Sequence, residues 1–361
     1  MTDPETTGPT ADPSTDAAAR VPTRPLGTGR SRLRWLVAGI VTLAVIVAAM
    51  GVAAFAGQRT SSGAAAPAYL PADTLVYADA RLDLPGDQGQ QLAAFLAKFP
   101  GFADQSALPA KLDDLMSRLV NETTHGKVDW GTDVKPWFGG QVAAGLIAVP
   151  ASTNATTPPP SLIALTVTDE AAAGKAVDAA LSRSGLAVTA AQSHRDVTIR
   201  TVKVPVPDTA TTQGAPQSES LSFAVAPGML LLSPQASTIS QALDLEAGQG
   251  SSLADASAFT SAVGKLRADR LGTFYLDAPG LLAAVSKAAA SASPAASAMA
   301  GLRDAVGGPI AAELHVEDGR LVAVSRTPRG SAMPAQTART SDLAAHVPAD
   351  SVLYVETHDA G

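Results

Sequence analysis

The feature that most constrains this chain is an uninterrupted apolar run from Trp35 to Gly57, WLVAGIVTLAVIVAAMGVAAFAG, which contains no charged residue. About 20 apolar residues in a helix, each rising 1.5 Å, cross a hydrocarbon core about 30 Å thick. The run therefore predicts one transmembrane helix over residues 35–57, with the lipid bilayer as the partner of this segment.

The distribution of arginine around the run predicts its orientation. Arg59 is the one nearby cation after the run, whereas several arginines precede it: Arg20, Arg24, Arg30, Arg32 and Arg34. Positive charge stays on the cytoplasmic side of a membrane helix. We expect a single-pass, signal-anchored protein of the cell membrane, with a cytoplasmic N-terminus and an extracellular C-terminal domain.

The apolar run has two alternatives to a retained anchor. A buried core helix is rarely apolar on every face over this length. A cleaved signal peptide has small residues at 63–68 for its cleavage site, but a signal-peptide apolar region usually has about 7 to 15 residues. Cleavage of the anchor therefore stays open, and both membrane interpretations export the rest of the chain.

The segments on either side of the run lack the apolar side chains needed for a core. Residues 1–34 consist mainly of Thr, Pro, Asp and Ala, a composition that predicts a disordered cytoplasmic tail. Residues 58–68 are small and polar, and predict a short flexible linker. A folded domain is expected to begin at residue 69.

Residues 69–328 predict an exported α+β domain with antiparallel hairpins and amphipathic helices. Apolar residues at helical spacing predict helices near 92–99, 108–119 and 170–184. Pro227-Gly228 and Asp318-Gly319 each separate two apolar runs and predict hairpins. Further strands are expected at 74–81, 141–149, 162–168, 186–190 and 197–204.

Composition removes several classes of function. The chain has no cysteine, so disulfides, thiolate nucleophiles and thiolate metal sites are excluded. Its net charge is −7 and no long basic run lies outside the membrane flank, so nucleic acid is not an expected partner. No cofactor is predicted.

The most distinctive local sequence is Val128–Val142, where aromatic and charged residues alternate. Trp130 and Trp137 with Asp133 and Lys135 suggest a ligand platform, because aromatic rings offer large contact surfaces. The alternative is a structural corner in which the rings close one end of the core. We favour the corner, since a chain with 4% aromatic residues needs its large rings for packing.

Several short sequence segments of the chain resemble those of a known family. They are LPADTLVY at 70–77, FPGF at 99–102, DVKPWFG at 133–139, SSLAD at 251–255 and DRLGTFY at 269–275. Together they resemble the bacterial domain-of-unknown-function family 3352 over residues 69–361. The resemblance implies a membrane-anchored, exported protein and carries over no catalytic residue.

Motifs of common enzymes are missing from the chain. There is no G-x-S-x-G, S-x-x-K, H-E-x-x-H or P-loop, and no two of the five histidines are four residues apart. The leading hypothesis is a non-catalytic domain that binds or scaffolds an envelope component. An envelope hydrolase or transferase with a dispersed site, and a sensor coupled to the cytoplasmic tail, stay open as alternatives.

An internal repeat is predicted at the C-terminus. Residues 70–79 (LPADTLVYAD) align without gaps on residues 347–356 (VPADSVLYVE), and each copy follows a stretch of small residues. We therefore expect a linker over 329–346 and the beginning of a second, truncated repeat over 347–361. The full-length protein is expected to continue beyond this point.

Overall fold

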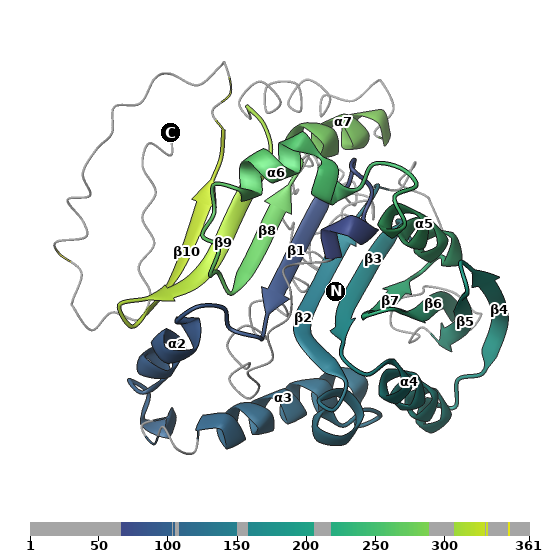
Figure 1. Cartoon of the computed structure of the whole chain (residues 1–361), viewed down its shortest axis with the longest axis horizontal. Coiled ribbons are helices and arrows are strands. Elements are labelled where there is room, and N and C mark those ends of the chain that lie inside the picture. Colours follow the sequence, from purple (N-terminus) through teal and green to yellow (C-terminus); the bar gives the residue numbers. More distant parts are fainter. Residues whose placement is uncertain are drawn as a thin grey trace, which may run out of the picture.

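The structure is a computed structural model that describes residues 66–102, 104, 108–149, 158–205, 218–288, 307–328, 330 and 346. These residues build a single antiparallel sheet covered by helices on both faces (Figure 1). The sheet has ten strands in the order β10-β9-β8-β1-β2-β3-β7-β6-β5-β4. Their bounds are β1 Val76–Arg81, β2 Phe138–Leu146, β3 Ser161–Val167, β4 Val188–His194, β5 Val197–Pro205, β6 Ser218–Ala226, β7 Met229–Ser233, β8 Gly272–Leu276, β9 Ile310–Glu317 and β10 Arg320–Arg326.

The α-helices lie between strands in the sequence and pack on one face or the other. Their bounds are α2 Gln88–Leu96, α3 Leu108–Thr124, α4 Glu170–Ser184, α5 Ala236–Glu246, α6 Ser257–Val263 and α7 Ala278–Ala288. Four shorter helical turns complete the described elements: η1 Ala66–Tyr69, η2 Pro100–Phe102, η4 Trp130–Val134 and η6 Leu253–Asp255.

Local sequence signals explain where these elements begin and end. Helix α4 begins at the side chain of Asp169, which accepts from the Ala172 N–H at 2.9 Å, and ends at Gly185, whose φ is 66°. The β9–β10 hairpin turns at Asp318-Gly319, with φ values of 50° and 67°. These are the conformations that Asp caps, C-terminal glycines and Asp-Gly turns favour.

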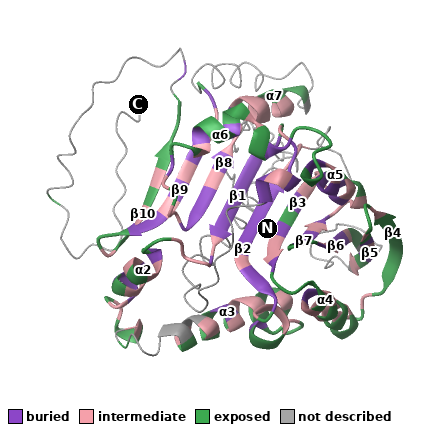
Figure 2. Cartoon of the chain, viewed as in Figure 1, coloured by how far each residue is buried: buried purple, intermediate pink, exposed green. Residues whose placement is uncertain are grey.

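The first apolar core lies on the sheet face covered by η1, α5, η6 and α6. Tyr77 of β1 packs edge-on against Phe259 of α6, with ring centroids 5.5 Å apart, and Phe259 packs against Tyr275 of β8 at 5.0 Å. Ile239 from α5 and Leu231 from β7 are fully buried in the same cluster. Most of the central sheet is accordingly buried in Figure 2.

The opposite face carries two further clusters. Residues of α3, η4 and α4 pack on β2, β3 and β7 around Met116, Trp130, Trp137 and Phe138. Helix α2 packs on β9, and its Leu92 shares a third cluster with Val316. Strand neighbours such as Leu230 and Leu231 enter opposite clusters, as the period of two along a strand requires.

The predicted α+β class is confirmed, and so are both predicted hairpins and helix 170–184. The strand expected at 186–190 instead runs from Val188 to His194, because its hairpin closes at Arg195-Asp196, a turn that was not predicted from the sequence. The domain begins earlier than expected, since Ala66 and Pro67 are already buried.

The predicted fold class also included a transmembrane helix, and the structure does not support that part of the prediction. Among the residues that the structure describes, no helix is both long and apolar enough to cross a bilayer. The run to which that helix was assigned, residues 35–57, lies outside the described residues, as do the predicted tail over 1–34 and the linker over 58–65.

Of the two predicted copies of the repeat, the structure describes the first, residues 70–79. In the first copy the strand begins at Val76, after Pro71 has formed an isolated bridge with Ser252. The second copy, residues 347–356, lies outside the described residues, as does most of the preceding linker. The shared strand conformation of the two copies therefore stays a prediction.

Candidate functional site

The aromatic corner, comprising Trp130, Asp133, Lys135 and Trp137, is the site predicted from sequence. Trp130 begins the helical turn η4, and Trp137 immediately precedes β2. The two side chains are 8% and 4% exposed, and each ring packs edge-on against Phe138, at centroid distances of 5.9 and 6.4 Å. The rings close the end of the core between α3, α4 and the sheet.

The polar atoms of the corner are bonded to one another. The Trp130 indole donates to Asp113 Oδ1 at 3.1 Å, and Lys135 Nζ lies 2.5 Å from Asp113 Oδ2. The Trp137 indole donates to the Asp133 carbonyl, while the Asp133 carboxylate accepts from Arg183 at 2.6 Å. The corner therefore satisfies its own donors and acceptors.

The structure brings all four predicted residues together, but it buries the rings that a ligand would contact. Asp129 caps η4, and hydrogen bonds from the backbone N–H and then the hydroxyl of Thr132 lower the pKa of its carboxyl. These contacts match the structural-corner interpretation. The ligand-platform hypothesis stays a prediction.

A buried group of ionisable side chains lies elsewhere, on neighbouring strands β1 and β8. Tyr77 is fully buried and lies opposite Tyr275 in the β1–β8 register. Asp79 is 5% exposed and lies opposite Thr273. Burial raises the pKa of Asp79, against the opposing effects of the nearby Tyr77 hydroxyl and the Arg270 charge. Burial and then the Asp79 charge hold the pKa of Tyr77 well above its usual range.

The group continues onto β9 with Glu313 and His315. His315 is 2% exposed, with Nδ1 3.8 Å from Glu313 Oε1 and Nε2 3.6 Å from Glu317 Oε2. Glu313 accepts from the backbone N–H of Arg267. The Tyr77 hydroxyl and His315 Nδ1 form no hydrogen bond within the described part of the chain.

This buried group holds the loop after α6 to the sheet. Arg270 donates through Nε to Thr273 at 2.6 Å and through NH1 to the Arg267 carbonyl, and Arg267 forms a bidentate pair with Asp269 at 3.0 and 2.9 Å. Burial separates the carboxyl, phenol and imidazole from solvent. The sequence does carry a signal for this group, the alternation of polar residues along the apolar strand at 76–81, but no site was predicted from it.

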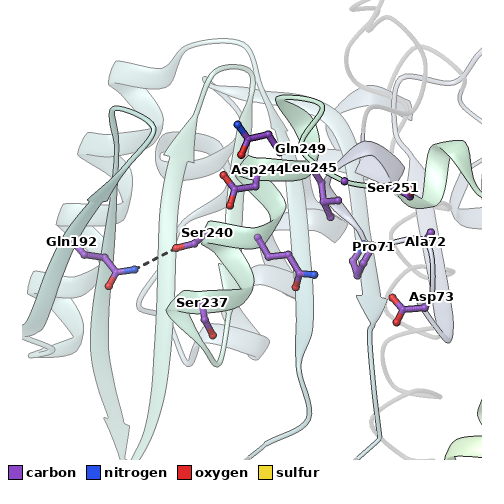
Figure 3. A pocket seen from close by; sticks show the side chains of 12 residues that line it. Pro71, Ala72, Asp73, Gln192, Ser237, Ser240, Asp244, Leu245, Gln249 and Ser251 are labelled. Atoms are coloured by element: carbon purple, nitrogen blue, oxygen red, sulfur yellow. Dashed lines mark hydrogen bonds between the residues drawn. The ribbon is translucent and has the colours of Figure 1, made fainter.

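A solvent-accessible groove of about 660 Å³ crosses the outer side of α5 (Figure 3). One end is formed by Gln192 of β4, and the other by the loop that contains Asp73. Between them the groove is lined by residues of α5 and of the loop after it, several of them polar: Ser237, Ser240, Gln241, Asp244, Leu245, Gln249, Gly250 and Ser251. The groove thus joins three segments that are far apart in the sequence.

Hydrogen bonds position only part of this lining. Gln192 donates to Ser240 Oγ at 3.4 Å, and Ser240 donates to the Ala236 carbonyl. Asp244 Oδ1 accepts from Arg195 at 2.6 Å and lies 2.9 Å from His194 Nε2. The bonds from Arg195 and then His194 lower the pKa of the Asp244 carboxyl.

Other polar side chains of the groove are free to bond a ligand. Ser237, Gln241 and Gln249 form no side-chain hydrogen bond with the described residues. Hydroxyl and amide groups can donate and accept, and the carboxylates of Asp73 and Asp244 accept. The groove can therefore hold a polar ligand by hydrogen bonds. It was not predicted from the sequence, because its residues form no local motif.

Comparison with known proteins adds a family and a distant structural likeness. The family model described as "Protein of unknown function (DUF3352)" matches residues 36–360. The crystal form I structure of TP0453 shares 10% identity with this chain, covering 76% of this chain and 83% of that one, with a TM-score of 0.36. No curated protein matches the chain in sequence.

Proposed function

We propose, from the premise that this chain belongs to the DUF3352 family of proteins of unknown function, that its α+β domain binds a polar component of the cell envelope without catalysis. The groove across α5 is the binding surface. The observation that carries the proposal is the set of hydroxyl and amide side chains along one accessible groove that form no side-chain hydrogen bond with the described residues. The corner around Trp137 offers no such set.

The lining favours a ligand rich in amides, hydroxyls and amines. Gln241 and Gln249 can each donate to and accept from an amide, and Asp73 can pair with an amine. Arg195 already pairs with the charge of Asp244, and His194 lies within hydrogen-bond distance of the same carboxylate oxygen. Peptidoglycan combines these ligand groups in one polymer, and we take it as the envelope component to test.

The enzyme alternative would use the Ser, His and Asp side chains near the groove. A serine nucleophile needs a base within hydrogen-bond reach of its hydroxyl. Ser240 instead donates to the Ala236 carbonyl and accepts from Gln192, while His194 is oriented on Asp244. These contacts support binding over acyl transfer.

Co-sedimentation of the protein with purified peptidoglycan tests the proposal. Wild type should pellet with the polymer and leave its soluble fragments unchanged. Replacement of both Gln241 and Gln249 by Ala should weaken binding about tenfold, because each lost hydrogen bond contributes about 0.5 to 1.5 kcal/mol. Gln90→Ala, which changes an exposed Gln on α2, is the matched control and should bind like wild type.

Two results would contradict the proposal. Equal pelleting of wild type and the double variant would place binding outside the groove. Release of soluble fragments that stops with Ser240→Ala would favour the hydrolase alternative. Residence of the domain outside the cytoplasm is part of the same proposal, and a reporter that is active only after export, fused after Ala68, measures it directly.

A further inference from the structure

Strands β4 and β10 are the open edges of the sheet in the described part of the chain, and they differ in charge (Figure 1). Strand β10 begins at Arg320 and ends at Arg326. Residues Val188–Ser193 of β4 contain neither a charge nor a proline, and all are exposed. Natural sheets usually protect an edge strand with charged residues or proline. Because β4 lacks both over this stretch, it is an edge that can still pair with another strand.

The β4–β5 hairpin determines which backbone groups point outward. Its turn residues, Arg195 and Asp196, both have positive φ, at 48° and 62°, as in a type I′ two-residue turn. The pair that closes such a turn, His194 with Val197, exchanges hydrogen bonds, and so do alternate pairs along the ladder. The N–H and C=O groups of the intervening Ala191 and Ser193 therefore point to the open edge.

We infer that two copies of this chain pair antiparallel along β4, about a two-fold axis at Gln192. In this register Ala191 of each copy lies opposite Ser193 of the other copy, and each pair exchanges two backbone hydrogen bonds. The strand is self-complementary because its outward groups are symmetric about Gln192. A register that used Thr189 would meet the irregularity between Val188 and Ala190.

Charge permits a second copy at this edge and opposes one at the other edge. The same symmetric pairing of β10 would place Arg320 opposite Arg326 of the second copy, and like charges directly opposite destabilise a strand pair. Along β4, Arg195 would instead lie opposite Thr189 of the second copy. Val188 is 42% exposed, and the pairing would remove part of its apolar surface from water.

The absence of cysteine from the chain allows a direct test of this register. Gln192 would face its own copy in a non-hydrogen-bonded pair, with Cα atoms about 4.5 Å apart, which is within the range that a disulfide spans. Gln192→Cys in the full chain should form a disulfide dimer under mild oxidation. Thr198→Cys, also exposed but on β5, is the control and should stay monomeric in non-reducing electrophoresis, because strand β4 separates it from the axis.

Sedimentation equilibrium of the full chain tests the backbone hydrogen bonds. Ala191→Pro removes an outward N–H without removing a β4–β5 hydrogen bond, and should weaken the dimer about 30-fold through the loss of two of the four bonds. Ala191→Thr keeps the N–H and should dimerise like wild type. A monomeric wild type, an Ala191→Pro variant that dimerises equally well, or equal cross-linking through residues 192 and 198 would overturn the inference. Should the proline variant fail to fold, the two cysteine variants decide the question.

Discussion

The aromatic corner and the groove across α5 use similar polar side chains in opposite ways. In the corner, the carboxylates of Asp113 and Asp133 accept from indole, ammonium, guanidinium and backbone donors of the same chain. In the groove, Ser237, Gln241 and Gln249 have no side-chain partner among the described residues. A cluster of polar and aromatic residues thus indicates a ligand site only where its hydrogen bonds are not already made within the fold.

The largest expected effect tests the corner as packing. Trp137→Ala should lower the free energy of unfolding by about 3 to 5 kcal/mol, because it removes a buried ring and leaves a cavity beside Phe138. Urea unfolding followed by circular dichroism measures the change. Gln241→Ala in the groove is the counterpart and should change stability by less than about 0.5 kcal/mol. Equal stability of Trp137→Ala and wild type would contradict the packing role and favour the ligand-platform hypothesis.

A second test asks whether the groove depends on the core beneath it. A Cβ added at Gly145 would lie 2.5 Å from Leu70 Cδ2, and Leu70 precedes the groove loop at Pro71. Gly145→Ala should cost about 1 to 3 kcal/mol through overpacking and should also weaken binding to peptidoglycan. Gly174→Ala, at an open position on α4, is the control and should lose neither stability nor binding to peptidoglycan. Unchanged binding by a destabilised Gly145→Ala would separate the groove from the core.

The third test compares the buried carboxyl group of Asp79 with the paired ones of the corner. Because burial raises its pKa, the folded state holds the Asp79 proton to higher pH than the unfolded state does. Stability should therefore fall as pH rises above about 4 toward the folded-state pKa, by at most about 1.4 kcal/mol per pH unit. Asp79→Asn should flatten that part of the curve relative to wild type when thermal unfolding is measured from pH 4 to 7. Parallel curves for the two proteins would contradict the raised pKa.

The smallest expected effect belongs to Asp244 at the groove, and its sign is opposite to that of Asp79. Arg195 and His194 lower the pKa of Asp244, so its contribution to stability is present above about pH 4 and disappears as pH falls through the lower folded-state value. Asp244→Asn should slightly lower the stability at neutral pH and should remove the part of the acid-side loss that Asp244 causes. The same thermal series, extended to pH 2, measures it. A larger pH effect for Asp244→Asn than for Asp79→Asn would contradict the expectation that burial shifts a carboxyl more than exposed pairing does.

The sequence predicted much of the fold where the signal is local. Helix 170–184 follows from its apolar spacing, with Asp169 and Gly185 as its ends. The hairpin at Asp318-Gly319 follows from its turn residues, because only a few residue types adopt positive φ without strain. The short segments that resemble a known family also predicted the family whose model matches the chain.

The candidate sites required contacts between distant residues. The sequence placed Trp130, Asp133, Lys135 and Trp137 together because they are close neighbours in the chain. It could not show that Arg183 and Asp113 would bind their polar partners. Nor could it assemble the groove, whose residues come from segments near 71, 192 and 237–251.

By itself, then, the sequence determined the local elements: strand and helix periodicity, caps and tight turns. Tertiary structure decided that β8 lies beside β1, that the rings of the aromatic corner are buried, and that β4 is an open edge of the sheet that the described residues form. The physical reason is the sequence separation over which each kind of interaction acts. A turn or a cap depends on backbone preferences within a few residues, whereas burial and hydrogen-bond satisfaction depend on which distant segments share the same surface.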